Sequence, residues 1–227
     1  HVVDNGTKPY PGDPAPRLDT AADITHDSCC VTRISLATHT GTHVDAEAHV
    51  IHGGKCLGDY PLTAFSGLAR VADLRGLSVV DVSALDSIES CDWLLLCTGQ
   101  SEKWGSEEYF GTEPLFTEAF VKAAARIARK GIGLDCSGLD REGVALHRLW
   151  FSSGGGLMVE NLTDLEMLLS ESRILFAAYP LKLAAGDGAP VRLKKGPHFQ
   201  MKDAGRNRPV ELRFSADACR AGRLQTV

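Results

Sequence analysis

Residues 38–49, Thr-His-Thr-Gly-Thr-His-Val-Asp-Ala-Glu-Ala-His, constrain the fold of this chain more than any other stretch. Three histidines and one aspartate stand here at offsets of 0, 4, 6 and 10: His39, His43, Asp45 and His49. Imidazole and carboxylate groups are the usual side-chain ligands of zinc and manganese. The rest of the chain must therefore act as a scaffold that presents these four groups to a small substrate.

Local geometry can unite the four groups in two ways. In an extended segment, His39, His43 and Asp45 share one face, and Gly41 leaves the space between them open. If a helix begins at Asp45 instead, His49 lies one turn away on the same side. A strand or loop that runs into a helix start would gather all four groups. A polar, histidine-rich surface loop is the alternative.

Composition excludes several classes of protein. The chain has 227 residues, 44% of them hydrophobic, and a formal net charge of −5, so nothing indicates a nucleic-acid surface. No apolar run approaches the roughly 20 residues that cross a bilayer. The seven cysteines form no C-x-x-C pair, which argues against a disulfide framework and a structural zinc cluster. We therefore expect a cytoplasmic protein with a small-molecule substrate and no nucleic-acid or membrane partner.

Predicted strands outnumber predicted helices. Apolar or alternating runs predict strands at residues 30–37, 68–74, 77–82, 93–97, 132–135, 157–160 and 174–179. Thr117 as N-cap and Gly131 as C-terminal stop predict a helix between them, and residues 163–170 predict a short one. The pattern predicts a mixed, sheet-rich α/β domain.

Two loops are candidate walls of a substrate site. Residues 10–14, Tyr-Pro-Gly-Asp-Pro, form a rigid turn that could lie across a pocket mouth through Tyr10, and a plain surface loop is equally compatible. Gln100 and Trp104 follow the buried run 93–97, where residues are well placed for function. Ordinary packing near the site is their alternative role.

The segment H-T-G-T-H-x-D-A-x-x-H at residues 39–49 resembles the signature of the cyclase-like metal-dependent hydrolases. That family includes bacterial kynurenine formamidases and isatin hydrolases. Further similar blocks stand at residues 10–14, 98–105, 133–135, 159–162, 180–183 and 186–192. The resemblance therefore runs almost continuously to about residue 193. It implies one domain over residues 1–193 with a swivelling β/β/α fold, assembled as a homodimer or homotetramer.

The resemblance also implies a set of six metal ligands: His39, His43, Asp45, His49, His147 and Glu160. The first three hold the first metal. In two-metal members Asp45 bridges to a second metal that the other three complete, whereas in one-metal members His49 is free to act as a base. The residues alone would favour an exposed His147 and an exposed Glu160. Zinc and manganese both suit nitrogen and oxygen ligands.

The implied reaction is hydrolysis of an amide or lactam C–N bond by a metal-activated water, with His49 or Glu160 as proton shuttle. A cyclic ester would fit the same chemistry. One rival is a metal-free hydrolase that uses Ser137, although residues 135–138 lack the first glycine of a nucleophile elbow. A second rival is a non-catalytic binding protein on the same fold. Residues 194–227 form a basic extension without a counterpart in the family.

Overall fold

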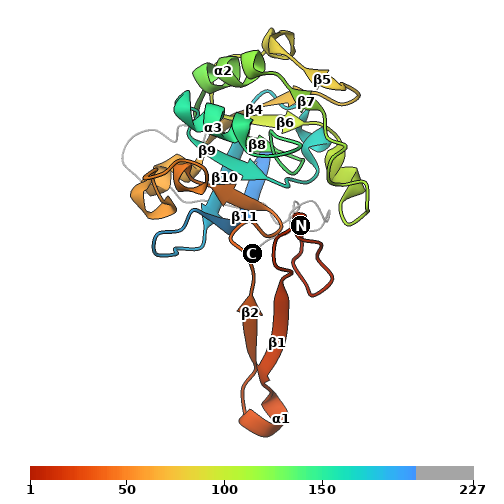
Figure 1. Ribbon diagram of the computed structural model, residues 1–227, viewed down its shortest axis with the longest axis vertical. Coiled ribbons are helices and arrows are strands. Elements are labelled where there is room, and N and C mark those ends of the chain that lie inside the picture. The colour runs from red at the N-terminus through yellow and green to blue at the C-terminus, as the bar shows by residue number, and fades with distance from the viewer. Residues whose placement is uncertain (198–227) are drawn as a thin grey trace, which may run out of the picture.

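Strand β6 (Cys91–Cys97) runs through the middle of the structure, a computed structural model that describes residues 1–197 (Figure 1). Its side chains alternate between two cores. Trp93 and Leu95 belong to a cluster that gathers residues from the other strands of the barrel, whereas Leu94 and Leu96 pack against two helices. The prediction of a strand buried on both faces is confirmed.

Seven strands close a barrel in the order β10–β11–β3–β9–β8–β6–β4. Their bounds, besides those of β6, are β3 (His43–Asp45), β4 (Ser66–Asp73), β8 (Ala128–Leu134), β9 (Leu157–Glu160), β10 (Ile174–Pro180) and β11 (Gly188–Pro197). The pairings along β4–β6–β8–β9 are parallel and the others are antiparallel. Short β3 lies between β9 and β11, so His43 stands opposite Glu160 in the register. This pairing brings two candidate ligands together.

Helices α2 (Glu118–Ile127) and α3 (Ala145–Ser152) cover the face of the sheet formed by β6 and β8. Thr117 caps α2 as predicted, because its side chain accepts a hydrogen bond from the backbone N–H of Phe120. The predicted end at Gly131 is wrong, since α2 ends at Ile127. Gly131 lies in β8 opposite Trp93, whose ring occupies the space that a Cβ would need. Pairing with β6 thus converts the end of the predicted helix into strand.

The remaining elements are short. A two-stranded sheet joins β5 (Val79–Val80) and β7 (Leu115–Phe116), so the strand predicted at residues 77–82 is mostly absent. The predicted helix at 163–170 is a 3-10 turn, η6 (Leu165–Leu168). The other 3-10 turns are η1 (Glu47–His49), η2 (Leu57–Asp59), η3 (Leu62–Phe65), η4 (Val82–Leu85) and η5 (Gln100–Lys103).

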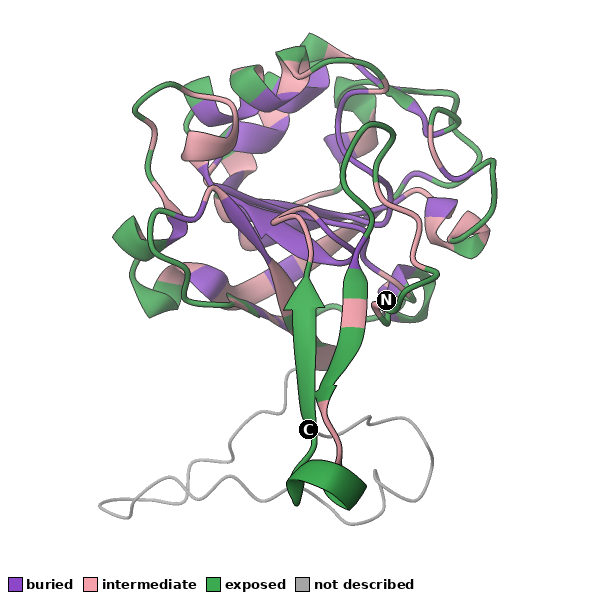
Figure 2. Cartoon of the chain, turned by 60° about the horizontal axis from the view of Figure 1, so that its bottom comes forward, coloured by how far each residue is buried: buried purple, intermediate pink, exposed green. Residues whose placement is uncertain are grey.

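A hairpin projects from the barrel (Figure 1). It consists of β1 (Arg17–Ala22), the short helix α1 (Ile24–Asp27) and β2 (Val31–Ser35), and we call residues 17–35 the arm. Figure 2 contrasts the exposed arm with the buried strands of the barrel. The predicted strand at 30–37 is present as β2, although it pairs only within the arm.

The sheet-rich α/β class is confirmed. All six cysteines among residues 1–197 are free. None of the helices in this part of the chain is long and apolar enough to span a membrane. Strand β11 continues to Pro197, so Lys194 and Lys195 lie in the barrel sheet, and the rest of the predicted basic extension lies outside the described residues.

Candidate metal centre

The signature segment combines the two arrangements considered from the sequence. His43 and Asp45 are alternate residues of β3 and are almost completely buried. Before them the chain is a turn, because Gly41 adopts a left-handed φ of 65°, and His39 stands on this turn. After them, η1 carries His49 back toward Asp45. The extended geometry is therefore limited to three residues.

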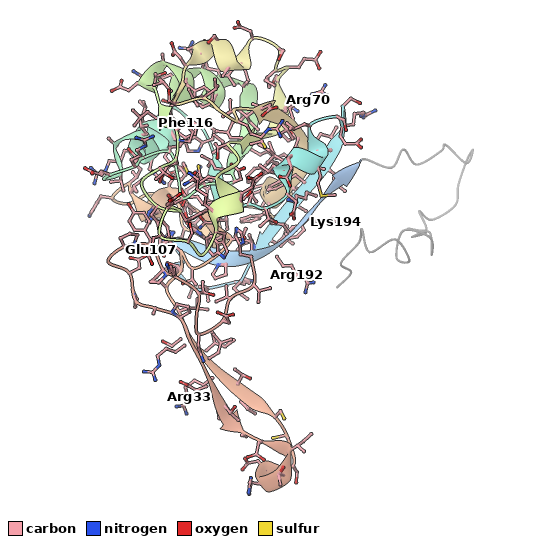
Figure 3. All side chains as sticks on the ribbon, turned by 90° about the vertical axis from the view of Figure 1, so that its right-hand side faces the viewer. Arg33, Arg70, Glu107, Phe116, Arg192 and Lys194 are labelled. Carbon is pink, nitrogen blue, oxygen red and sulfur yellow. The ribbon has the colours of Figure 1, made fainter. Side chains whose placement is uncertain are left out.

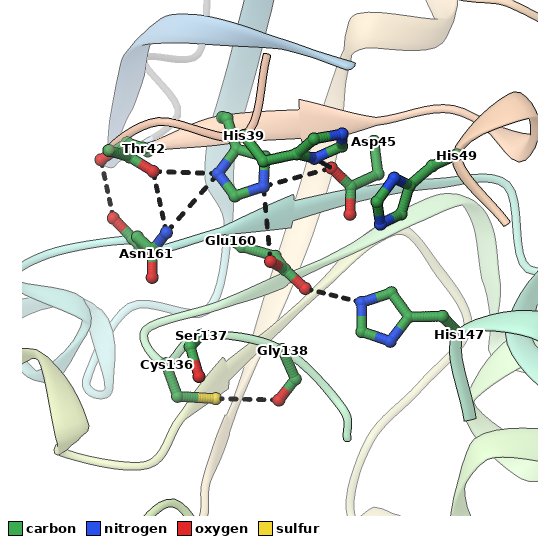
Figure 4. A network of polar contacts seen from close by, with 12 residues as sticks. His39, Thr42, Asp45, His49, Cys136, Ser137, Gly138, His147, Glu160 and Asn161 are labelled. Atoms are coloured by element: carbon green, nitrogen blue, oxygen red, sulfur yellow. Dashed lines mark hydrogen bonds and ion pairs between the residues drawn. The ribbon is translucent and has the colours of Figure 1, made fainter. Parts of the chain in front are cut away.

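The candidate ligands point toward one another around Asp45 (Figure 4). Asp45 Oδ1 lies 2.8 Å from His39 Nδ1 and 3.2 Å from His43 Nε2. His43 Nε2 is also 3.4 Å from Glu160 Oε2, and Glu160 Oε1 is 2.9 Å from His147 Nε2. The structure thus brings residues from β3, β9, α3 and the turn at His39 to one place.

The partners of His43 and His147 fix which nitrogen each ring offers to the centre. His43 Nδ1 lies 2.9 Å from the carbonyl oxygen of Gly41, which can only accept, so Nδ1 carries the hydrogen. His147 Nδ1 lies 2.6 Å from Asp140 Oδ2 and donates in the same way. In both rings Nε2 is therefore the nitrogen that faces the centre and that would offer a lone pair to a metal once the ring is neutral, and the carboxylate behind His147 is the support typical of a metal-bound histidine.

Two buried atoms of this network lack a hydrogen-bond partner among the described residues: His43 Nε2 and Asp45 Oδ2. Buried polar atoms are rarely left in this state. The ligand atoms form two groups within 4.8 Å, His39–Asp45–His49 and His43–Asp45–Glu160. A donor set of imidazole nitrogens and carboxylate oxygens with unpaired atoms fits a zinc or manganese ion. This grouping differs from the division implied by the resemblance, although Asp45 is shared in both.

The imidazoles and carboxylates of the centre shift one another's pKa values. Burial alone would raise the pKa of Asp45, but the imidazoles of His43 and His39 hold it well below its usual range. Burial lowers the pKa of His43, and the carboxylates of Asp45 and Glu160 outweigh this and raise it well above its usual value. Without a cation the His43 imidazole therefore takes up a proton, which a bound metal would displace.

Asp140 and Gly138, which the sequence analysis did not identify as site residues, position His147. Asp140 accepts hydrogen bonds from the backbone N–H groups of Leu146 (2.8 Å) and His147 (2.9 Å), so it also caps the first turn of α3. Gly138 has a φ of 145°, and a Cβ there would stand 2.7 Å from Glu160 Oε1. Asp140 stands five positions before the start of α3, whose N-cap position is Val144, so the N-cap rule could not have identified it from the sequence.

Asp187 was also missed. It lies just before β11, and its Oδ2 is 3.0 Å from His39 Nε2 and 3.7 Å from His49 Nδ1. Its side chain is 41% exposed. The only sequence feature that marks Asp187 is its place in the block at residues 186–192. Its contact partner His39 lies 148 positions earlier in the sequence.

A cavity of about 240 Å³ opens onto the centre and is lined by His39, His43, His49, His147 and Glu160. Tyr10, Trp104 and Phe110 form its aromatic wall. The Tyr10 and Phe110 rings meet edge to face, with centroids 5.6 Å apart. Two of the three predicted substrate contacts, Tyr10 and Trp104, therefore face the cavity.

Gln100 is placed elsewhere. It is buried, and its amide nitrogen lies 2.6 Å from the carbonyl oxygen of Tyr109 and 2.8 Å from Thr112 Oγ1. It does not line the cavity, and its hydrogen bonds hold the loop at residues 106–112 against η5. Gln100 thus supports the segment that carries Phe110.

Ser137 lines the cavity but lacks the partner that a nucleophile needs. Its hydroxyl donates to Glu113 Oε1 over 2.6 Å, and no histidine within residues 1–197 is hydrogen-bonded to it. A serine nucleophile requires an adjacent general base. The geometry therefore favours the metal centre over the serine rival.

Comparisons with known proteins identify the family of this chain. A family model described as "Putative cyclase" matches residues 1–141. The kynurenine formamidase of Salinibacter ruber is 30% identical over 200 residues, which cover 84% of this chain and 92% of that protein. The solved structure of a potential metal-dependent hydrolase with cyclase activity is 28% identical, with a TM-score of 0.68 over 85% of this chain and 92% of that one.

Isatin hydrolase A from Labrenzia aggregata, solved with benzyl benzoate, has a TM-score of 0.71 at 22% identity. It covers 85% of this chain and 90% of that one, and this likeness shows a shared fold. The family model spans more than half of the chain, and the Salinibacter relative is covered almost entirely. This chain therefore belongs to the cyclase family.

Proposed function

We propose that this protein is a metal-dependent hydrolase that cleaves an amide or lactam C–N bond in a small aryl or cyclic substrate, as an arylformamidase does. The observation that carries the proposal is the convergence of imidazoles and carboxylates on Asp45, with two buried atoms unpaired, at the floor of an aromatic cavity. The kynurenine formamidase relative supports the same reaction class.

The groups His43–Asp45–Glu160 and His39–Asp45–His49 would hold one or two zinc or manganese ions, with His147 beside Glu160. Such an ion supplies a water of lowered pKa and polarises a carbonyl oxygen. Glu160 is occupied, since each of its carboxylate oxygens faces an imidazole. We therefore expect Glu160 to be committed to holding the metal beside His43 and His147, and not to carry protons.

His49 is the residue we assign as proton shuttle. Burial lowers its pKa, so its ring is neutral at pH 7 and can accept a proton. Within residues 1–197 its Nδ1 lies 3.7 Å from Asp187 Oδ2, beyond hydrogen-bond distance, which leaves its nitrogens available. The rings of Tyr10, Trp104 and Phe110 would hold a flat substrate above it.

The test is a small substrate panel with zinc-loaded and manganese-loaded protein: N-formylkynurenine, isatin and a cyclic aryl ester. We expect hydrolysis of at least one C–N substrate and its loss after treatment with a chelator. Activity that survives removal of the metal would overturn the proposal. Hydrolysis of the ester alone would show that the substrate is a cyclic ester and not an amide or lactam.

Metal content separates the hydrolase from a misassigned site. We expect His43→Ala and Asp45→Ala each to lose bound metal in elemental analysis. The control is His52→Ala, because His52 is exposed in a nearby turn. Full metal content in both ligand variants would show that the ligands are assigned wrongly. A loaded protein that hydrolyses nothing would favour the non-catalytic alternative.

A further inference from the structure

Ser137 and Glu113 form a buried polar pair in the wall of the cavity, and the proposed reaction does not use it. The Ser137 hydroxyl donates to Glu113 Oε1 over 2.6 Å, and the two residues are 8% and 2% exposed. The second carboxylate oxygen, Glu113 Oε2, is buried without a hydrogen-bond partner among residues 1–197. Burying a charged group without full compensation destabilises a fold, so packing alone does not explain this pair.

Glu113 reaches this position because the chain enters the core there. Figure 3 labels the residues on either side of it, Glu107 and Phe116. The side chain of Glu107 is 94% exposed and pairs with Lys8 at the cavity rim, whereas Phe116 is buried in the core. The loop thus carries one acidic side chain to the rim and a second one behind the cavity wall.

The chain holds Ser137 firmly. It follows β8, and the two residues before it are tied to neighbouring segments. Asp135 accepts hydrogen bonds from the backbone N–H (2.8 Å) and the hydroxyl (2.5 Å) of Thr98. The carbonyl oxygen of Cys136 accepts one from the backbone N–H of Asn161 over 3.0 Å. Such support preorganises a side chain for binding.

Ser137 lines the cavity directly beside the candidate metal centre (Figure 4). The next residue, Gly138, stands against the centre, because a Cβ there would lie 2.7 Å from Glu160 Oε1 and 2.9 Å from His147 Cε1. A ligand group held by Ser137 is therefore close to the atoms that would take part in hydrolysis.

The pairing decides what Ser137 can offer to a ligand. A hydroxyl has one hydrogen and two lone pairs, and the hydrogen of Ser137 is directed to Glu113. Toward the cavity the oxygen can therefore only accept, and the carboxylate behind it strengthens it as an acceptor. Burial raises the pKa of Tyr10, and the negative charge of Glu113 raises it further, so this charge acts within the cavity.

The other buried acceptor side chains that line the cavity already have partners: Asp140, Glu160 and Asn161. Asp140 and Glu160 face imidazole nitrogens of the centre. Asn161 Oδ1 accepts a hydrogen bond from the Tyr109 hydroxyl over 2.7 Å. Ser137 is thus the buried acceptor that a ligand with an N–H group would meet.

We propose that Ser137, with Glu113 as its positioning residue, binds the N–H of the scissile bond and selects secondary amides and lactams against esters and N-substituted amides. The proposal rests on the proposed hydrolase function. The nitrogen of an amide is bonded directly to the carbonyl carbon, so an N–H held by Ser137 places the carbonyl beside the centre. An ester oxygen has no hydrogen to donate and would leave the Ser137 acceptor unpaired.

Binding of a lactam that resists hydrolysis tests this without turnover. Oxindole and its carbocyclic analogue share one ring frame and differ in whether N–H or CH2 stands beside the carbonyl. In calorimetric titrations of the zinc-loaded protein, we expect oxindole to bind about 3–10-fold more tightly than the analogue, the usual value of one hydrogen bond. Ser137→Ala should bind both equally. Ser83→Ala, in which an exposed serine on η4 is changed, is the matched control and should keep the preference.

Glu113→Gln is the second variant, because it keeps the size of the side chain and the Ser137 hydroxyl but removes the charge behind it. We expect the preference for oxindole to fall while the affinity for the analogue is unchanged, an effect that a merely structural role would not produce. Equal affinities in the wild type, no binding of either ligand, or a preference that both variants retain would overturn the proposal. A protein with the expected pattern that hydrolyses nothing would refute the hydrolase alone, whereas a hydrolase without the pattern would refute the role of Ser137 alone.

Discussion

The candidate metal centre has two halves that share Asp45 but lie in opposite surroundings. In the inner half, the side chains of His43, Glu160 and His147 are at most 8% exposed. In the outer half, those of His49 and Asp187 are 27% and 41% exposed. Charges interact strongly in the dry interior and are screened in water. The inner half is thus suited to hold a cation, and the outer half to meet substrate and exchange protons.

The backbone reinforces this difference. The candidate ligands of the inner half stand on β3, β9 and α3, and a main-chain carbonyl and a carboxylate fix which nitrogen His43 and His147 present to the centre. The outer residues stand on a turn, on η1 and on the loop before β11. Regular elements hold side chains in place more firmly than loops do. Variants of the two halves should therefore fail in different ways.

The largest effect should come from His49→Gln. We expect kcat to fall by about 10²–10⁴-fold, the usual contribution of a general base, while the metal held by the inner half remains. Steady-state kinetics and elemental analysis measure the two quantities. If the variant loses all metal, His49 belongs to the ligands and the two halves are not distinct in function.

Asp140→Asn should weaken metal binding by about 10–100-fold, because it removes the carboxylate behind His147. Competition with a chromophoric chelator measures the affinity. Asp86→Asn is the matched control, since Asp86 is exposed at the C-cap of η4. An unchanged affinity in Asp140→Asn would mean that His147 does not ligate the metal.

Asp187→Asn should have a smaller effect, below about tenfold in metal affinity, the lower end for such support. Water can replace an exposed carboxylate, so little of its contact with His39 is lost. The same competition assay applies. A loss equal to that of Asp140→Asn would remove the distinction between an inner and an outer half.

The spacing of the signature segment was enough to predict that His43 and Asp45 share a face, because side chains alternate along a strand. The spacing could not predict that the chain turns at Gly41. Because of this turn, His39 approaches Asp45 from a turn and not from the face of a strand. His147 and Glu160 entered through the resemblance alone, and the structure places Glu160 between His43 and His147. Their role as ligands remains a prediction.

Other features depend on contacts between distant segments. The apolar run 93–97 was enough to predict a strand buried on both faces, because a continuous run of apolar side chains can be seen in the local sequence. The end of α2 at Ile127 could not be predicted, because pairing of β8 with β6 decides it. Alternation identified β2, yet nothing in it shows that the strand leaves the barrel. Asp140 and Asp187 reach the centre only through folding.

The smallest expected effect concerns stability of the metal-free protein against pH. Burial alone would lower the pKa of His147, but hydrogen bonds to Asp140 and Glu160 outweigh it and raise the pKa to about 10. In the unfolded chain it is about 6.5. The protonated ring thus stabilises the fold fully below about pH 6.5, and this contribution is lost as the pH rises toward 10. Urea unfolding of chelator-treated protein should show the free energy of unfolding decline over this window, with a weaker decline in Asp140→Asn. Stability that rises instead, or an identical decline in the variant, would show that His147 is not held as a cation between two carboxylates.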